Sequence, residues 1–265
     1  MRRLKHFITA IILCLVLPCS YGNAISVEVN GKPLESPVYL QDGITYVPLV
    51  DLLHTLNGGT ASWDGKKVTV LSELYTLTIP IAAESVSVDD SQFPLNGKTF
   101  IENGRTYVPL RSLANLLGAD VTYTDANTPV SVTSREKFSY TEEDFDWMSR
   151  IISAESCGEC LMGQIAVGNV VLHRLHCDRY PNTIREVILD DEYAVQFEPV
   201  ENGSINNSPT RQSILAAKLV FAGVEAVENC LYFFSPALSE GTWIQENTTY
   251  VTTIGCHQFY CDPVN

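Results

Sequence analysis

The chain has 265 residues, of which 31 are acidic and 17 basic, so its formal net charge is −14. A surface of that charge repels nucleic acid and anionic lipid at long range, which argues against a nucleic-acid-binding protein. Hydrophobic residues make up 45% and charged residues 18%. This composition is typical of one large or two ordinary globular domains and not of a disordered chain.

The first 24 residues have the layout of a secretory signal peptide. Basic side chains precede an apolar run over residues 8–17, and small residues stand three and one positions before the bond that follows Ala24. This pattern predicts a signal peptide over residues 1–24 that is removed by cleavage after Ala24. The apolar run is short for a bilayer, so we expect an exported protein with no stable membrane span after cleavage. An uncleaved anchor and a lipoprotein attached through Cys19 are the alternatives.

Six cysteines remain after the signal peptide, and all lie in the C-terminal half: Cys157, Cys160, Cys177, Cys230, Cys256 and Cys261. An even number of cysteines in an exported domain predicts disulfides, although the sequence does not choose among the pairings. A metal site at the Cys157-x-x-Cys160 motif is an alternative. No second Cys-x-x-Cys motif completes a four-ligand set, so we expect no metal and no other cofactor.

Residues 25–135 contain an internal duplication. The segment DGITYVPL at residues 42–49 recurs as NGRTYVPL at residues 103–110. Leucines at helical spacing follow each copy and predict a short helix. Asn-Gly pairs at residues 30–31 and 96–97 predict hairpin turns. Each copy is therefore a small α+β unit, and we expect the two copies to stack or intertwine around a shared core.

The pattern GRTYVPLRSLANLLG at residues 104–118 resembles the stalk-type domain named for the copper amine oxidase N-terminal region. The resemblance covers roughly residues 25–133 and implies extracellular attachment or spacing. It implies no copper here, because this part of the sequence offers no evident ligand set. We place the end of this domain at residue 135 and the start of the next at residue 138.

The C-terminal half begins with a helix that carries a carboxylate on its apolar face. Thr141 is a suitable N-cap, and the predicted helix runs over residues 145–154. Its apolar face consists of Phe145, Met148, Ile151 and Ile152. At 100° per residue, Glu155 falls on that face, where desolvation raises the pKa of a carboxyl group. A raised pKa is what a general acid needs at neutral pH. The alternative is that Glu155 ends the helix and faces solvent.

The rest of the chain predicts an α+β domain. A largely apolar helix is expected over residues 161–175, a short one over 184–188, and another from 210 to 222. The stretch 190–209 between them is polar and irregular. Strand-like segments follow at residues 230–234 and 250–254, with a tail over 255–260. Helices followed by a small late sheet are typical of the α+β class.

Five motifs in this half resemble the SleB-type cell wall hydrolase family. In order, they are WMSRIISAESCGECLMGQIAVGNVVLHRL, YPNTIREVI, QFEPVENGSI, LYFFSP and TTIGCHQFY. The resemblance implies that residues 138–265 are a catalytic domain with a fold like those of lysozyme and the lytic transglycosylases. It also implies that the partner is the glycan strand of peptidoglycan, in the cell wall or the spore cortex. A secreted protein of the cell wall or spore envelope is expected, and no protein partner is predicted.

The same resemblance places the catalytic glutamate at Glu155. It places substrate-binding residues at Glu159, Gln196, Phe197, Tyr232, Phe234, His257 and Tyr260. The chain departs from the family pattern at Cys157 and Cys160, where Arg and Pro are common, and at His173, where Asn is common. None of these departures removes a carboxylate, so they affect the expected substrate preference and not the expected activity.

The reaction type stays open between two routes. Most glycosidases use a second carboxylate, whereas a lytic transglycosylase needs one acid, because the 6-hydroxyl of the muramyl sugar attacks. We expect the second route, with Glu155 as general acid and then base. A catalytically inactive peptidoglycan-binding protein is the alternative. An amidase or peptidase is disfavoured, since the adjacent Cys256 and His257 would point apart on a strand.

Overall fold

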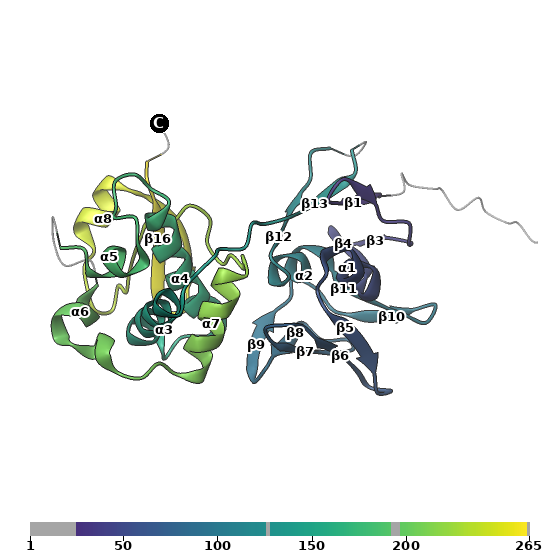
Figure 1. Ribbon diagram of the computed structural model, residues 1–265. Helices are drawn as coiled ribbons and strands as arrows, with labels where there is room; N and C mark the ends of the chain where they lie inside the picture. The colour runs from purple at the N-terminus through teal and green to yellow at the C-terminus, as the bar shows by residue number, and fades with distance from the viewer. Residues whose placement is uncertain (1–24, 126–127, 192–196, 264–265) are drawn as a thin grey trace, which may run out of the picture.

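The computed structural model describes residues 25–125, 128–191 and 197–263. Figure 1 shows a β-rich N-terminal half beside a mainly helical C-terminal half, joined by one extended linker. The predicted signal peptide lies outside the described residues. Among the helices that the structure describes, none is long and apolar enough to cross a bilayer.

The N-terminal half consists of three antiparallel or mixed sheets and two short helices. Its elements are β1 (Val27–Val29), β2 (Lys32–Pro33), β3 (Tyr39–Gln41), β4 (Ile44–Pro48), α1 (Leu49–Leu56), β5 (Thr60–Trp63), β6 (Lys67–Leu71), β7 (Thr76–Pro80), β8 (Ser85–Val88), β9 (Ser91–Pro94), β10 (Phe100–Glu102), β11 (Arg105–Pro109), α2 (Leu110–Leu116), β12 (Ala119–Thr122) and β13 (Val130–Ser134). The strand orders are β12-β13-β1-β2, β10-β11-β4-β3 and β5-β6-β7-β8-β9.

The duplication forms the central sheet of this half. Strands β4 and β11 pair antiparallel with Val47 opposite Val108, which are equivalent positions of the two copies. The order β10-β11-β4-β3 is therefore symmetric about that pair. Each copy continues from its proline directly into a helix, α1 or α2, whose leucines are buried. The two copies thus intertwine, which is one of the two arrangements that the repeat predicts.

The second Asn-Gly pair does not make the hairpin that its sequence predicts. Asn30 and Gly31 do join β1 to β2, but the strand before Asn96 is β9, the last of the five-stranded meander β5–β9. The Asn96 backbone N–H donates to Ser112 Oγ of α2 at 2.9 Å. Gly97 lies so close to Tyr46 that an added Cβ would be 2.3 Å from its hydroxyl. Contacts with the rest of the domain therefore override the local turn preference.

The C-terminal half packs helices around α4 with a small sheet on one side. Its elements are α3 (Glu142–Ser156), α4 (Leu161–Leu175), α5 (Ile184–Leu189), α6 (Glu198–Asn202), a 3-10 turn (Ser204–Asn206), α7 (Arg211–Phe221), β14 (Tyr232–Phe234), α8 (Thr242–Asn247), β15 (Thr249–Ile254) and β16 (His257–Cys261). The sheet has the order β14-β16-β15. The predicted mixture of α and β is confirmed, whereas α6, the 3-10 turn and α8 are not predicted from the sequence.

Close packing of α3, α4 and α7 depends on one glycine. An added Cβ at Gly168 of α4 would lie 2.8 Å from Val220 of α7 and 2.9 Å from Ile152 of α3. The start of α3 is set by the predicted cap, since Asp144 N–H donates to Thr141 Oγ1 at 3.1 Å and Thr141 N–H donates to Asp144 Oδ2 at 2.9 Å. Helix α3 therefore has a defined start and a buried face, and it carries Glu155 near its end.

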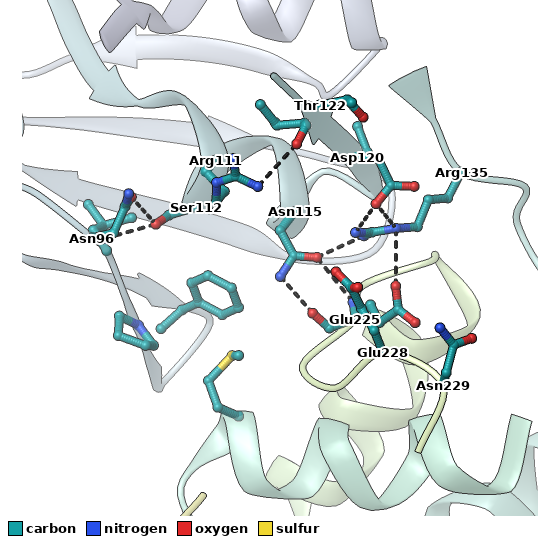
Figure 2. Close-up of a pocket in the computed structure, with 16 residues that line it drawn as sticks. Asn96, Arg111, Ser112, Asn115, Asp120, Thr122, Arg135, Glu225, Glu228 and Asn229 are labelled. Carbon is teal, nitrogen blue, oxygen red and sulfur yellow. Dashed lines mark hydrogen bonds and ion pairs between the residues drawn. The ribbon is translucent and has the colours of Figure 1, made fainter. Parts of the chain in front are cut away.

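Arg135 at the start of the linker holds the two halves together (Figure 2). Its guanidinium forms an ion pair with Asp120 at 2.6 Å and donates to Asn115 Oδ1 at 2.8 Å, both in the N-terminal half. It also donates to the Gly223 carbonyl at 2.8 Å and lies 3.6 Å from the Glu225 carboxylate, both in the C-terminal half. A cavity of about 740 Å³ lies beside this junction and is lined by residues of both halves.

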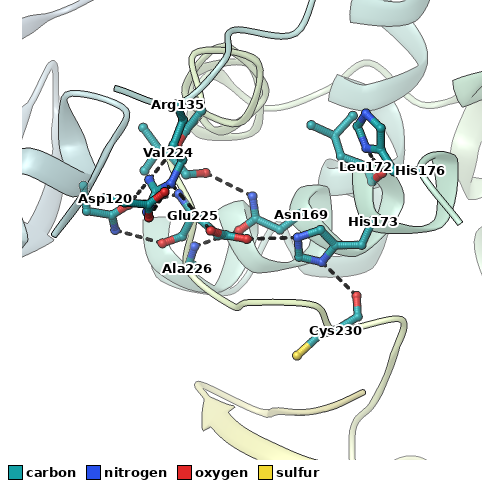
Figure 3. A network of polar contacts seen from close by, with 12 residues as sticks. Asp120, Arg135, Asn169, Leu172, His173, His176, Val224, Glu225, Ala226 and Cys230 are labelled. Atoms are coloured by element: carbon teal, nitrogen blue, oxygen red, sulfur yellow. Dashed lines mark hydrogen bonds and ion pairs between the residues drawn. The ribbon is translucent and has the colours of Figure 1, made fainter. Parts of the chain in front are cut away.

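The polar network extends from the junction to α4 (Figure 3). Glu225 contacts His173 Nε2 at 3.1 Å, and His173 Nδ1 lies 3.0 Å from the Cys230 carbonyl. Asn169, one turn earlier on α4, donates to the Val224 carbonyl at 3.0 Å and accepts from Ala226 N–H at 2.8 Å. The loop after α7 is therefore bonded to α4 on one side and to the N-terminal half on the other.

We predict that Arg135→Gln loosens the junction. The substitution removes charge-assisted hydrogen bonds and leaves Asp120 and Glu225 without their cation, so the free energy of unfolding should fall by about 1–3 kcal/mol. Thermal unfolding and the rate of proteolytic cleavage in the linker measure the change. Arg105→Gln is the matched control, because Arg105 pairs with Asp51 within the N-terminal half. Equal cleavage rates for the two variants would contradict the assignment.

Candidate active site

Glu155 lies in the last turn of α3, directly after the buried Ile151 and Ile152. It is half-buried, and its pKa is raised to about 7. Burial is the main cause, the Glu198 carboxylate raises the pKa further, and the Arg174 guanidinium lowers it. The raised pKa agrees with the helical phase of the sequence, and the catalytic role of Glu155 stays a prediction.

Arg174 is a buried cation in the same site. It lies on α4 and is 4% exposed, and its Nε donates to the Leu231 carbonyl at 2.8 Å. Its guanidinium carbon lies 5.0 Å from the centre of the Phe197 ring and 5.2 Å from that of Tyr180. Burial lowers its pKa. In the described part of the chain its Nη1 has no hydrogen-bond partner, so one buried N–H group is available to an oxygen atom.

Two further carboxylates act on these groups. Glu198, at the start of α6, is exposed and raises the pKa of Glu155. Asp190, at the C-terminal cap of α5, raises the pKa of Arg174. Both lie in the polar, irregular stretch of residues 190–209, whose acidic residues are candidates for a second carboxylate by position alone. The structure therefore selects Glu198 and Asp190 as the carboxylates whose charge reaches the site.

Glu159 lies in the turn between α3 and α4 and contacts the sheet. Its Oε2 accepts from the Cys256 N–H at 3.2 Å. Gly255 has a φ of 59°, which favours glycine, and an added Cβ there would lie 1.6 Å from the same oxygen and displace the carboxylate. His257 follows in β16 and is buried, and its ring is edge-on to Phe233 at 5.3 Å. Burial lowers the pKa of His257, while Glu159 opposes that shift.

The register of the small sheet separates the other predicted binding residues. Tyr232 pairs with Tyr260, and Phe234 stacks on Tyr260 at 5.7 Å, so these three side chains share one face. His257 is three residues before Tyr260 and lies on the opposite face with Phe233. The predicted set is therefore divided between the two faces of the sheet.

The remaining predicted residues are Phe197 and Gln196. Phe197 is 1% exposed and packs beneath the Arg174 guanidinium, so it supports that cation from below. Gln196 lies outside the described residues. The binding roles of all these side chains stay predictions.

Sequence reasoning missed Arg174 and Tyr180. Arg174 carries a usable signal, since it is a strongly basic residue near the end of an otherwise apolar predicted helix. Such a residue is either at the surface or held by partners, and here it is held by Leu231 and two aromatic rings. Tyr180 packs against the cluster that contains Tyr232, and burial raises the pKa of Tyr180. Only the fold brings these tyrosines to Arg174.

The six cysteines are free thiols, which corrects the prediction of a disulfide. Cys157 and Cys160 are the C-cap of α3 and the N-cap of α4, so their spacing serves the turn between two helices. Cys230 is buried against Ala166 and other apolar residues, and burial raises its pKa to about 12. It acts there as a small apolar side chain. Among the described residues, no group of three or more potential ligands is placed to hold a metal ion.

Comparison with protein families identifies both halves. Residues 158–260 match the Cell Wall Hydrolase model, and residues 28–132 match the Copper amine oxidase N-terminal domain model. Glu155 lies three residues before the first of these matches. The spore cortex-lytic enzyme of Bacillus cereus is 31% identical over 120 residues, which are 45% of this chain and 45% of that protein. The enzyme of the same name from Bacillus subtilis is 26% identical over 139 residues, 50% of this chain and 44% of that protein.

The chain thus spans less than half the length of these curated relatives. Among solved structures, the catalytic domain of the germination-specific lytic transglycosylase SleB from Bacillus anthracis is 30% identical. The similarity covers 46% of this chain and 96% of that one, with a TM-score of 0.42. The chain carries a domain of the cell wall hydrolase family at its C-terminus, preceded by a domain of the copper amine oxidase N-terminal type.

Proposed function

We propose that this chain cleaves the glycan strands of peptidoglycan, in the cell wall or the spore cortex, as a lytic transglycosylase. The observation that carries the proposal is the half-buried Glu155, whose pKa is about 7 beside Arg174 and Glu198. A carboxyl group with that pKa is protonated and deprotonated in comparable amounts near neutral pH, as an acid that also serves as a base requires. The family match and the relatives named spore cortex-lytic enzymes agree with it.

In the proposed reaction, protonated Glu155 donates its proton to the glycosidic oxygen, and the bond from that oxygen to C1 of the muramyl sugar breaks. The 6-hydroxyl of the same sugar then attacks C1, and the Glu155 carboxylate accepts the hydroxyl proton. Burial and the Glu198 charge favour the protonated state before the first step. The Arg174 charge favours the carboxylate that the first step produces. The products are an anhydro-muramyl end and a free hydroxyl on the leaving sugar.

Hydrolysis would require a base that activates water, and Glu198 and Asp190 are the candidates in the described site. Asp190 is the C-cap of α5, and Glu198 is the first residue of α6. Both routes use one carboxyl group of raised pKa as the acid, and hydrolysis adds a second carboxylate that stays ionised. Mass spectrometry of the released fragments separates the routes, since transglycosylation leaves anhydro-muramyl ends and hydrolysis leaves reducing ends. Fragments with reducing ends alone would overturn the transglycosylase proposal.

We further propose a division of labour. Residues 1–24 direct export to the wall or spore envelope, residues 25–135 attach or space the protein, and residues 138–265 hold the catalytic machinery. Glu155, Arg174 and Tyr180 all lie in the last segment. The N-terminal half has instead a core of aliphatic and aromatic side chains.

A fragment of residues 138–265 should therefore fold and cut soluble glycan fragments. Phe138 and Tyr140 remain in it, and they stack on Phe221 at 5.6 and 4.2 Å, so the helical half keeps its own cover. Circular dichroism and product release from soluble fragments measure the two properties, with the full chain as reference. A folded fragment that cuts nothing, while the full chain cuts, would show that the N-terminal half completes the site.

We predict that Glu155→Gln lowers glycan cleavage by at least about a hundredfold, because an amide has no proton to donate and general acid–base catalysis contributes about 10²–10⁴ in rate. Glu159→Gln is the matched comparison, since its amide oxygen can still accept from Cys256 N–H. It should lose less activity. The rate of product release from purified walls gives both values. An inactive Glu159→Gln variant beside an active Glu155→Gln variant would show that Glu155 is not the acid. A wild-type protein without cleavage activity would favour a peptidoglycan-binding role.

The raised pKa of Glu155 also predicts how activity and stability depend on pH. Its acid form is needed at the first step, so the rate should fall as the pH rises through about 7. The neutral form is favoured in the folded state, so its stabilisation is complete below pH 4.5 and is lost as the pH rises to about 7. Glu155→Gln should thus unfold at a higher temperature than the wild type at pH 8. Thermal unfolding of the wild type and of Glu155→Gln at pH 4 and pH 8 measures this. An equal difference in stability between the two proteins at both pH values would contradict the prediction.

A further inference from the structure

A row of tyrosines crosses the small sheet of the C-terminal half. Tyr232 of β14 pairs with Tyr260 of β16, and Tyr260 pairs with Tyr250 of β15, so one position on each strand is a tyrosine. The rings of Tyr250 and Tyr260 are edge-on, with centres 5.6 Å apart. Neighbouring strands lie about 4.8 Å apart, so the row extends over roughly 10 Å, which is longer than one sugar ring.

The row is exposed at its Tyr250 end and buried at Tyr260 and Tyr232. Tyr232 and Tyr260 are 9% and 5% exposed, whereas Tyr250 is 52% exposed. Trp243 of α8 packs edge-on against Tyr232 with ring centres 5.8 Å apart, and it is 60% exposed. Two large aromatic side chains thus stand in solvent on a base of buried tyrosines, which holds them without covering them.

The row begins beside the candidate active site. Tyr180 packs against the cluster that contains Tyr232, and Tyr180 lies against the Arg174 guanidinium. Arg174 in turn acts on the charge of Glu155. A chain of contacts therefore leads from the proposed proton donor to Tyr232 and then to the exposed Trp243. The exposed aromatics are continuous with the site and not an isolated surface feature.

The surroundings of these aromatics are polar, and the nearby cation Arg179, which donates to the Tyr232 hydroxyl at 3.3 Å, is paired with Asp262. Residues 242–254 have the sequence TWIQENTTYVTTI, with one glutamate and no lysine or arginine. The Tyr250 hydroxyl is hydrogen-bonded to Thr253 at 2.9 Å. Anionic lipid would require basic residues, and a protein interface would require a larger apolar core. A polymer with apolar ring faces and many hydroxyls fits aromatic faces set among amides and hydroxyls.

We propose that Trp243 and Tyr250 form a platform on which the glycan strand stacks beyond the sugar that is cleaved. This inference rests on the proposed function and adds to it the direction in which the strand leaves the site. Each aromatic side chain would cover the face of one sugar, while Asn247, one turn after Trp243 on α8, offers its amide oxygen to a sugar hydroxyl. The platform would then matter for long strands and not for the shortest fragment that is cut.

The test compares KM for long and short soluble glycan fragments. For Trp243→Ala and Tyr250→Ala, the KM of long fragments should rise about threefold to tenfold relative to wild type, the range that a lost aromatic contact gives. The shortest cleavable fragment should show a smaller rise. Trp243→Phe should restore most of the affinity, because it keeps an aromatic face. Trp63→Ala is the matched control, since Trp63 is 49% exposed in β5 of the N-terminal half.

Two kinds of outcome separate this inference from the proposed function. If the wild type cuts no glycan, the proposed function fails. If it cuts glycan and the two alanine variants show the same KM ratio between long and short fragments as wild type, the platform is overturned. Binding of long fragments to proteins that also carry Glu155→Gln gives an independent reading without turnover, and unchanged dissociation constants there would overturn it too. So would glycan-independent vesicle binding or self-association that depends on Trp243.

Discussion

Burial and the electrostatic attraction between Glu155 and Arg174 act in opposite directions on the ionisation of both groups. The packing of α3 against α4 removes both groups from water, and desolvation raises the pKa of the carboxyl while it lowers that of the guanidinium. Their mutual attraction works against both shifts. Burial alone would favour the protonated form of Glu155, whereas a close cation alone would favour its ionised form. Burial and the Glu198 charge outweigh the Arg174 charge, and the pKa of Glu155 is raised to about 7.

Helix α4 carries residues of both the candidate site and the junction between the two halves. Arg174 turns toward Leu231 and the rings of the site, while the preceding residue, His173, turns toward Glu225 and the junction with the N-terminal half. Adjacent residues of a helix point about 100° apart, so one helix can carry the cation of the candidate site and a junction contact side by side. Asn169 of the same helix forms two hydrogen bonds with the loop after α7. The position of α4 is thus fixed from two directions, which limits how far Arg174 can move from Glu155.

Sequence patterns predicted the features that depend on local periodicity. The Thr141 cap, the apolar face that ends at Glu155 and the repeat around Val47 and Val108 all follow from spacing along the chain. Features that depend on distant segments were not predicted. The place of Arg174 between two rings requires Phe197, which is far from it in sequence, to pack beneath it. The cysteine count suggested disulfides because it records composition and compartment, whereas pairing depends on positions in space.

The small sheet shows most directly why a resemblance in sequence does not by itself define a binding surface. Motif positions predict Tyr232, Tyr260 and His257 together as substrate-binding residues. Strand alternation nevertheless puts the histidine on the face that packs against the helical core. Only the tyrosine face continues into solvent, through Trp243 at one end and Tyr250 at the other. A glycan strand that reaches Glu155 along this sheet can therefore be guided by one face alone, and the register of three strands decides which side chains that face presents.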